Sequence, residues 1–183
     1  MSPAVPLLRR LLRRFSRADD GVTAVEFAIV GPVFFALLIG IFETAFFMMA
    51  NQMIETATID SSRLILTGQA QDEGFDAARF KDEVCSRVPS MIDCSGNVWT
   101  DVRTLSTFDE SVAVPTDDDG NFDSTQLIYS AGGPDDIVMV RLYYKWTGVI
   151  AEAARGVGLD LGNQPDGSTL MVATMVFRNE PYQ

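Results

Sequence analysis

A long apolar run, residues 27–50, constrains this chain more than any other feature. Only Glu43 and Thr44 interrupt the run. At 1.5 Å per residue of helix it extends about 36 Å, whereas the hydrocarbon core of a bilayer is about 30 Å thick. A buried core helix of a soluble protein is the alternative, but few such helices directly follow five arginines, as this run does. We therefore expect a membrane-spanning helix.

Charge is divided unevenly on the two sides of this run. The chain has a net charge of −11, yet residues 1–21 carry five arginines against two aspartates. Basic residues stay on the cytoplasmic side, so we expect a cytoplasmic leader at 1–21 and an acidic domain across the membrane. The acidic balance argues against nucleic acid as a partner. Apolar residues of the leader recur at helical spacing, which is typical of a membrane-surface segment; a simple orientation tag is the alternative.

Beyond the run the sequence predicts an α+β fold. Helical periodicity continues to Gly68, so one long helix is expected to leave the membrane and offer a narrow apolar stripe to a domain at 51–183. The stripe comprises Met53, Ile54, Ala57, Ser61, Leu64 and Ile65. A second, amphipathic helix is expected over 76–88, with Ala77, Phe80, Val84 and Val88 on its apolar face and Pro89 ending it.

The last third of the chain changes to a period of two, which is typical of strands. Residues 137–146 predict a half-buried strand, residues 170–178 a similar one, and residues 98–105 a weaker third. The connection at 148–167 contains a short helical pattern at 149–155 and then glycine-rich turns. We expect an antiparallel sheet packed on the anchor helix, in an order that the pattern leaves open.

The residues around the start of the apolar run indicate proteolytic processing. Gly21 follows the charged leader, and glycine enters a narrow protease groove in an extended conformation. Cleavage after Gly21 would leave Val22 as the first residue. Glu26 and Phe27 then stand at the mouth of the apolar run. We expect 1–21 to be a removable leader and 22–50 to be the transmembrane and assembly helix.

Glu26 needs a partner, because a carboxylate near hydrocarbon costs about 2.5–3.5 kcal/mol on insertion scales. Cleavage would create an α-amine on Val22, with an ordinary pKa of about 7.7–8.0. The amine of a neighbouring subunit, shifted along the axis by about 6 Å, could pair with Glu26 when helices pack in parallel. The alternatives are that Glu26 stabilises its own helix N-terminus or lies in the hydrated headgroup zone.

These features resemble a known family. The leader, Gly21, Glu26, the segment 40–43 (GIFE) and the ending 176–181 (VFRNEP) are similar to TadE-type pseudopilins, the minor pilins of the tight-adherence pilus within the type IV pilin superfamily. The resemblance covers both ends, while residues 70–165 correspond to a variable region. Phe27 departs from the tyrosine usual in the major pilins of such systems, which favours the minor class.

The resemblance implies a function in the bacterial inner membrane. A prepilin peptidase would cut after Gly21, so that Glu26 becomes the fifth mature residue. The protein would assist assembly or function of a surface pilus used in attachment and biofilm formation. Its partners would be other pilins or pseudopilins, in a hetero-oligomer, and the pilus assembly platform.

Two residues within the run leave alternatives open. Glu43, about 24 Å of helix beyond Phe27, is expected near the outer interface, where it either snorkels to water or contacts a partner subunit in assembly. Pro32 either bends the helix during extraction into a filament or is a tolerated membrane proline.

The cysteines predict a disulfide. Cys85 ends the second helix, Cys94 lies nine residues on, and an exported chain meets an oxidising compartment. Free thiols are the alternative. We expect no metal, because the chain has no histidine and two thiolates half-ligate a tetrahedral ion.

No catalytic constellation is recognisable, and we expect neither enzymatic activity nor a cofactor. The acidic segment 117–123 offers oxygen atoms to calcium, but its glycine is misplaced for an EF-hand, so a solvated turn is favoured. Two further functions stay open. The chain could be an uncleaved single-pass anchor presenting a periplasmic binding module to an export machine, or an adhesin acting through an exposed insertion at 109–136.

Overall fold

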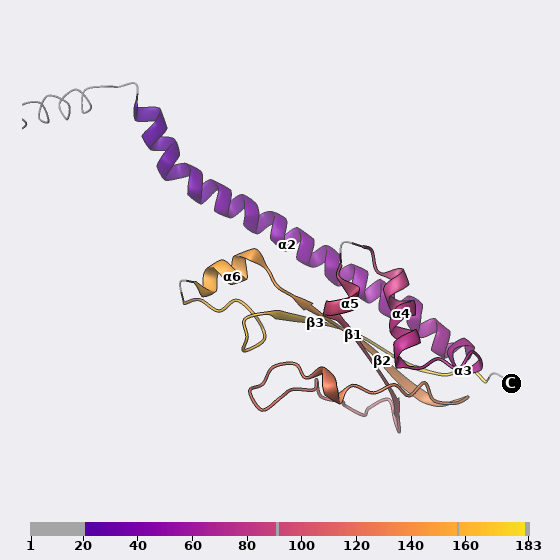
Figure 1. Cartoon of the computed structure of the whole chain (residues 1–183). Helices are drawn as coiled ribbons and strands as arrows, with labels where there is room; N and C mark the ends of the chain where they lie inside the picture. The colour runs from indigo at the N-terminus through magenta and orange to yellow at the C-terminus, as the bar shows by residue number, and fades with distance from the viewer. Residues whose placement is uncertain (1–20, 91, 157, 182–183) are drawn as a thin grey trace, which may run out of the picture. The chain divides into compact units, whose positions relative to one another are not determined.

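The computed structural model describes residues 21–90, 92–156 and 158–181 (Figure 1). The predicted leader at 1–21, with its amphipathic pattern, lies outside the described residues except for Gly21. The chain divides into two compact units, 1–42 and 43–183. The boundary falls within a single helix, α2 (Val22–Leu66), so the last residues of the apolar run belong to the second unit.

Helix α2 confirms the expected long helix. It begins directly after Gly21 and continues through Pro32. One stretch of it is long and apolar enough to cross a membrane. After Leu66 the chain turns at Gly68, whose φ of +81° is the left-handed conformation that glycine adopts without strain. The short helix α3 (Gln69–Asp72) follows.

The three predicted strands form one antiparallel sheet in the order β1-β2-β3. They are β1 (Val98–Leu105), β2 (Ile137–Trp146) and β3 (Thr169–Arg178). Leu105 pairs with Ile137 at one end of the sheet, and Tyr144 pairs with Val98 and Met171 toward the other. The long connections after β1 and β2 belong to the insertion at 109–136 and to a segment that contains α6 (Val149–Arg155).

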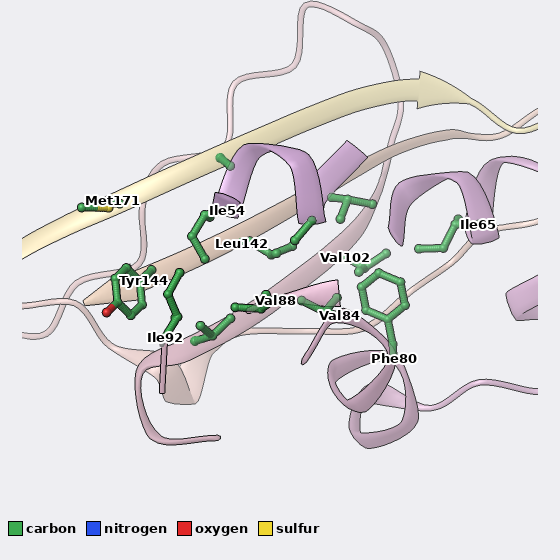
Figure 2. Close-up of a cluster of buried hydrophobic side chains, with 14 of the residues drawn as sticks. Ile54, Ile65, Phe80, Val84, Val88, Ile92, Val102, Leu142, Tyr144 and Met171 are labelled. Carbon is green, nitrogen blue, oxygen red and sulfur yellow. The ribbon is translucent and has the colours of Figure 1, made fainter. Parts of the chain in front are cut away.

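The main core lies between one face of this sheet and the helices α2 and α4 (Ala77–Arg87), as Figure 2 shows. The predicted stripe of α2 is confirmed by Ile54, Ala57 and Ile65, each at most 1% exposed. The side chains that Figure 2 labels are Ile54, Ile65, Phe80, Val84, Val88, Ile92, Val102, Leu142, Tyr144 and Met171. Their burial is the main source of stability of the second unit.

The packing face of α2 also contains hydroxyl residues. Thr58, Ser61 and Ser62 are buried, and each hydroxyl donates to the backbone carbonyl four residues earlier, at 2.7, 2.6 and 2.6 Å. These bonds remove the cost of burying a polar group without a partner. Small side chains on this face let the sheet approach the helix closely.

The second helix is confirmed over Ala77–Arg87. Asp76 caps it by accepting the backbone N–H of Arg79 at 2.8 Å, which explains where it begins. Phe80 and Val84 are completely buried, and Val88 is 8% exposed. Ala77 departs from the predicted apolar face, because it lies in the first turn and is exposed.

The prediction that β2 is half-buried is wrong, since both of its faces are covered. On the face away from the helices, Tyr143 and Met139 are 0% and 2% exposed. The insertion at 109–136 folds back over this face, placing the Phe122 ring 4.7 Å from that of Tyr143. The insertion is therefore exposed only in part, because its aromatic side chains pack on the sheet.

The insertion also covers the outer edge of β1. Val102 donates its N–H to Ile128 O at 2.9 Å and accepts the N–H of Ser130 at 2.8 Å, forming a short parallel bridge. Open strand edges invite unwanted pairing with other chains. The segment 128–130 blocks this edge from such pairing.

The predicted disulfide is present. It joins Cys85 in α4 to Cys94, the first residue of α5 (Cys94–Asn97), with the Cα atoms 5.6 Å apart. Asp93 caps α5 by accepting the N–H of Gly96, and the hydrogen bond from the Ser95 hydroxyl is the main cause that lowers the pKa of Asp93. The disulfide and this cap together hold α5 beside α4.

Replacing both cysteines, Cys85→Ser with Cys94→Ser, is expected to lower the free energy of unfolding by about 2–3 kcal/mol, because closing so short a loop restricts the unfolded chain. Chemical denaturation of the full chain in detergent, followed by tryptophan fluorescence, measures the loss. A reductant should act on the parent protein and leave the double variant unchanged. A parent midpoint that is insensitive to reductant contradicts the prediction.

Candidate assembly interface

The described part of the first unit offers an apolar surface on all sides. Phe27, Leu37 and Ile41 are 66–68% exposed, and their neighbours are similar. A helix that is apolar all round belongs in a protein core or in a membrane. This surface can therefore contact lipid and other apolar helices.

The predicted cleavage site lies at the start of this surface. Gly21 immediately precedes α2, and a Cβ added there would meet no atom within 4 Å. Val22, which would become the first residue, is 51% exposed. No other described residue therefore crowds the Cα of Gly21.

Glu26 projects from the second turn of α2, next to Phe27. It is exposed, and among the described residues it belongs to none of the four ion pairs. The stabilising effect of a helix N-terminus on a carboxylate falls off within the first turn, and α2 begins four residues earlier, at Val22. The position of Glu26 beyond the first turn thus argues against the alternative in which it only stabilises the N-terminus of its own helix.

Glu43 has a partner in its own chain, which the sequence did not reveal. Its Oε2 accepts the backbone N–H of Ile150, the second residue of α6, at 2.8 Å. The side chain of an N-cap residue normally takes this bond, but the N-cap of α6 is Gly148, which has none. A Cβ at Gly148 would overlap Glu43 Oε1, so a larger residue there would require the Glu43 side chain to shift.

A second set of hydrogen bonds, around Asp166, holds the end of the connection between β2 and β3. Asp166 Oδ1 accepts the N–H and hydroxyl of Ser168 at 2.9 and 2.6 Å, and its Oδ2 pairs with Lys145 of β2. The bond from Lys145, followed by that from Ser168, lowers the pKa of Asp166 to about 2. Arg155 at the end of α6 donates to the Asp166 carbonyl. The connection from β2 to β3 is thus tied at both ends.

An apolar groove of about 90 Å³ lies within the second unit, where the apolar run ends. It is lined by Phe46, Met49, Ala50, Met53, Ile92 and Trp146. Trp146 also packs edge-on against Phe47, with ring centres 6.1 Å apart. The groove offers no charged side chain to a ligand.

The acidic segment 117–123 uses its carboxylates locally. Asp117 Oδ1 accepts the N–H groups of Asp119 and Asn121 at 3.0 and 2.8 Å, closing a turn. Asp123 caps η2 (Ser124–Gln126), and the Thr125 hydroxyl is the main cause that lowers the pKa of Asp123. Within the described ranges, no group of three or more His, Cys, Asp or Glu is placed to hold a metal ion.

The C-terminal motif that contributed to the resemblance has a structural role. Asn179 is 2% exposed, and its amide donates to the carbonyls of Ala131 and Gly133 at 3.0 and 2.9 Å. The next residue, Glu180, donates its N–H to Leu66 O at the end of α2. This ending joins the end of α2 to the loop before β2.

Sequence reasoning missed one buried charge. Asp101 of β1 is fully buried and accepts Arg103 Nε at 3.0 and 2.8 Å and the N–H of Ile128 at 3.0 Å. Arg103 donates in turn to Gln126 O at 2.9 Å. The only signal was an aspartate and an arginine two residues apart, which share one face of a strand.

Comparison with known proteins finds a match for the N-terminal helix. A family model described as TadE-like protein matches residues 21–63, from the predicted cleavage glycine to the part of α2 that packs on the sheet. No curated protein and no solved structure matches the chain. The TadE-like family is a pilin-type structural family rather than a family of enzymes. The TadE-like match at residues 21–63 supports a pilin-like protein associated with a tight-adherence pilus.

Proposed function

We propose that the chain is a minor pilin or pseudopilin that takes part in assembling a tight-adherence pilus by packing α2 in parallel with the helices of other pilins. One observation carries the proposal: the TadE-like segment combines an exposed apolar helix with a glutamate, Glu26, that has no ion-pair partner among the described residues. A carboxylate at such a place needs a cation, and helix packing would supply one.

In this proposal the residues of α2 have separate roles. A prepilin peptidase removes 1–21, which exposes the Val22 amine and removes the five arginines that hold the leader in the cytoplasm. Glu26 then receives the amine of a neighbouring subunit, and Phe27 packs beside that pair. Glu43 contributes by fixing α6 to the helix.

The second unit lies outside the cytoplasm in this proposal. The disulfide between Cys85 and Cys94 supports that side of the membrane, since disulfides persist in oxidising compartments. The domain would then cap, prime or decorate a fibre that serves in surface attachment and biofilm formation. Its partners would be other pilins, in a hetero-oligomer, and the assembly platform.

Mass spectrometry of the membrane-bound protein tests the proposal. In a strain with active prepilin peptidase the mature chain is expected to begin at Val22, and deletion of the peptidase should restore the leader. A bulky residue at the cut, in Gly21→Leu, should block processing, whereas Gly31→Ala, away from the cut, should not. An intact leader in the active strain would overturn the proposal and favour an uncleaved anchor.

A further inference from the structure

The connection between β2 and β3, residues 147–168, carries the most exposed large apolar side chains outside α2 among the described residues. Val149, Leu159 and Leu161 are 72%, 60% and 59% exposed. Three such side chains in one connection give this segment an exposed apolar character, which suits contact with lipid or with another apolar surface. We propose that this connection, the β2–β3 lobe, lies on the outer surface of the membrane with these side chains in the lipid.

Glu43 sets the depth of the lobe. Its bond to the Ile150 N–H ties the start of α6 to a residue inside the apolar run, and both belong to the same compact unit. Reaching Glu43 from Phe27 takes about 24 Å of helix, less than the roughly 30 Å of hydrocarbon that a membrane offers. The hydrocarbon therefore extends about four residues past Glu43, or roughly 6 Å. Interfacial helices embed their apolar face by about 5–10 Å, which is the same depth.

The lobe begins directly after a residue that contacts the apolar run. Trp146, two residues before the N-cap of α6, contacts Phe47 and lines the apolar groove together with Phe46 and Met49. Tryptophan is enriched where a membrane meets water, because its ring is apolar and its N–H is polar. The start of the lobe thus lies next to apolar residues of α2.

The charges of the lobe indicate which lipid it meets. Arg155 and Lys145 are both engaged with Asp166, while Glu152 and Asp160 are exposed. The described residues of the lobe, 147–156 and 158–168, therefore offer no basic patch to anionic headgroups. The contact rests on apolar burial and is expected on zwitterionic membranes.

The test uses lipid photo-crosslinking with the full chain, and it rests on the proposed membrane anchor. The crosslinker p-benzoylphenylalanine is placed singly at Leu159, Leu37 or Phe108, and each protein is reconstituted in phosphatidylcholine vesicles. Phe108 is the matched control: it is 56% exposed, but it follows Leu105, at the end of the sheet opposite Trp146. Lipid adducts are expected at Leu37 and Leu159, and only background at Phe108.

The outcomes separate this inference from the anchor itself. Adducts at Leu37 with only background at Leu159, or with Leu159 crosslinked to a second copy instead, overturn the lobe contact and leave the anchor standing. Background at Leu37 overturns the anchor and with it the inference. Equal yields at Leu159 and Phe108 also overturn the lobe contact, because they show no preference for the membrane end.

A second variant tests the role of Glu43. Glu43→Ala removes the acceptor of the Ile150 N–H, so the lipid adduct at Leu159 should fall while that at Leu37 stays constant. Glu55→Ala, also on α2, is the control, since the Glu55 side chain accepts a bond from the Asn51 side chain of the same helix, one turn earlier. An unchanged Leu159 adduct in Glu43→Ala overturns the assignment of depth to Glu43.

Discussion

Replacing Glu26 by glutamine is expected to leave the protein in the membrane but to abolish pilus assembly. Glutamine keeps the size and hydrogen-bonding capacity of the side chain and removes its charge. Removing one partner of a pair buried among helices costs about 3–5 kcal/mol, which lowers subunit association by two orders of magnitude or more. Counting surface pili and measuring the protein in sheared fibres and in membranes gives the result.

Glu55→Gln is the matched control for this experiment, because it makes the same chemical change in α2 beyond the apolar run. It should assemble normally. Raising the external pH above about 8 should also begin to loosen the parent fibres, because free subunits then have a neutral Val22 amine that must bind a proton before it can pair with Glu26. Normal piliation of Glu26→Gln would contradict the pairing and return Glu26 to a role in its own chain.

Replacing Asp101 by alanine is expected to lower the free energy of unfolding of the second unit by about 3 kcal/mol. The change leaves the N–H of Ile128 without an acceptor and Arg103 without its counterion. The low end of the range for buried pairs applies because the Arg103 side chain remains 24% exposed. Denaturation of the full chain in detergent measures the loss as a lower midpoint.

Two variants and a local probe make this prediction specific. Asp101→Asn keeps an acceptor for Ile128, so its loss should be smaller. Asp118→Ala, in the exposed turn at 117–123, should leave the midpoint unchanged. Amide exchange at Ile128 and Ser130 should accelerate in Asp101→Ala, because both amides lie where the insertion meets β1. Unchanged exchange would mean that Asp101 does not hold the insertion.

The sequence predicted the elements well because their patterns are local. Periodicity placed β1, β2 and α6 at the residues that the structure gives, and Asp76 and Pro89 bracketed α4. The long helix followed from an apolar run continued by a stripe without Gly or Pro before Gly68. The disulfide followed from spacing and compartment.

The prediction failed where distant segments meet. Alternation in β2 suggested a half-buried strand, because its second face holds both polar and apolar side chains. Residues of that face such as Tyr143 are nevertheless buried, because another segment covers them. That segment, the insertion at 109–136, has no regular period, so its packing left no readable pattern. Its contact with β1 through Asp101 became visible only in three dimensions.

The apolar run at 27–50 shows the same division between what local sequence and what tertiary contacts determine. By itself the sequence determined an apolar run long enough for a membrane, a glycine before it and two glutamates within reach of lipid, because length, charge and residue type are local properties. Tertiary structure alone decided that Glu43 serves as the missing cap of α6, 107 residues away along the chain. A hydrogen bond depends on which atoms the fold brings together, and no local pattern records that distance.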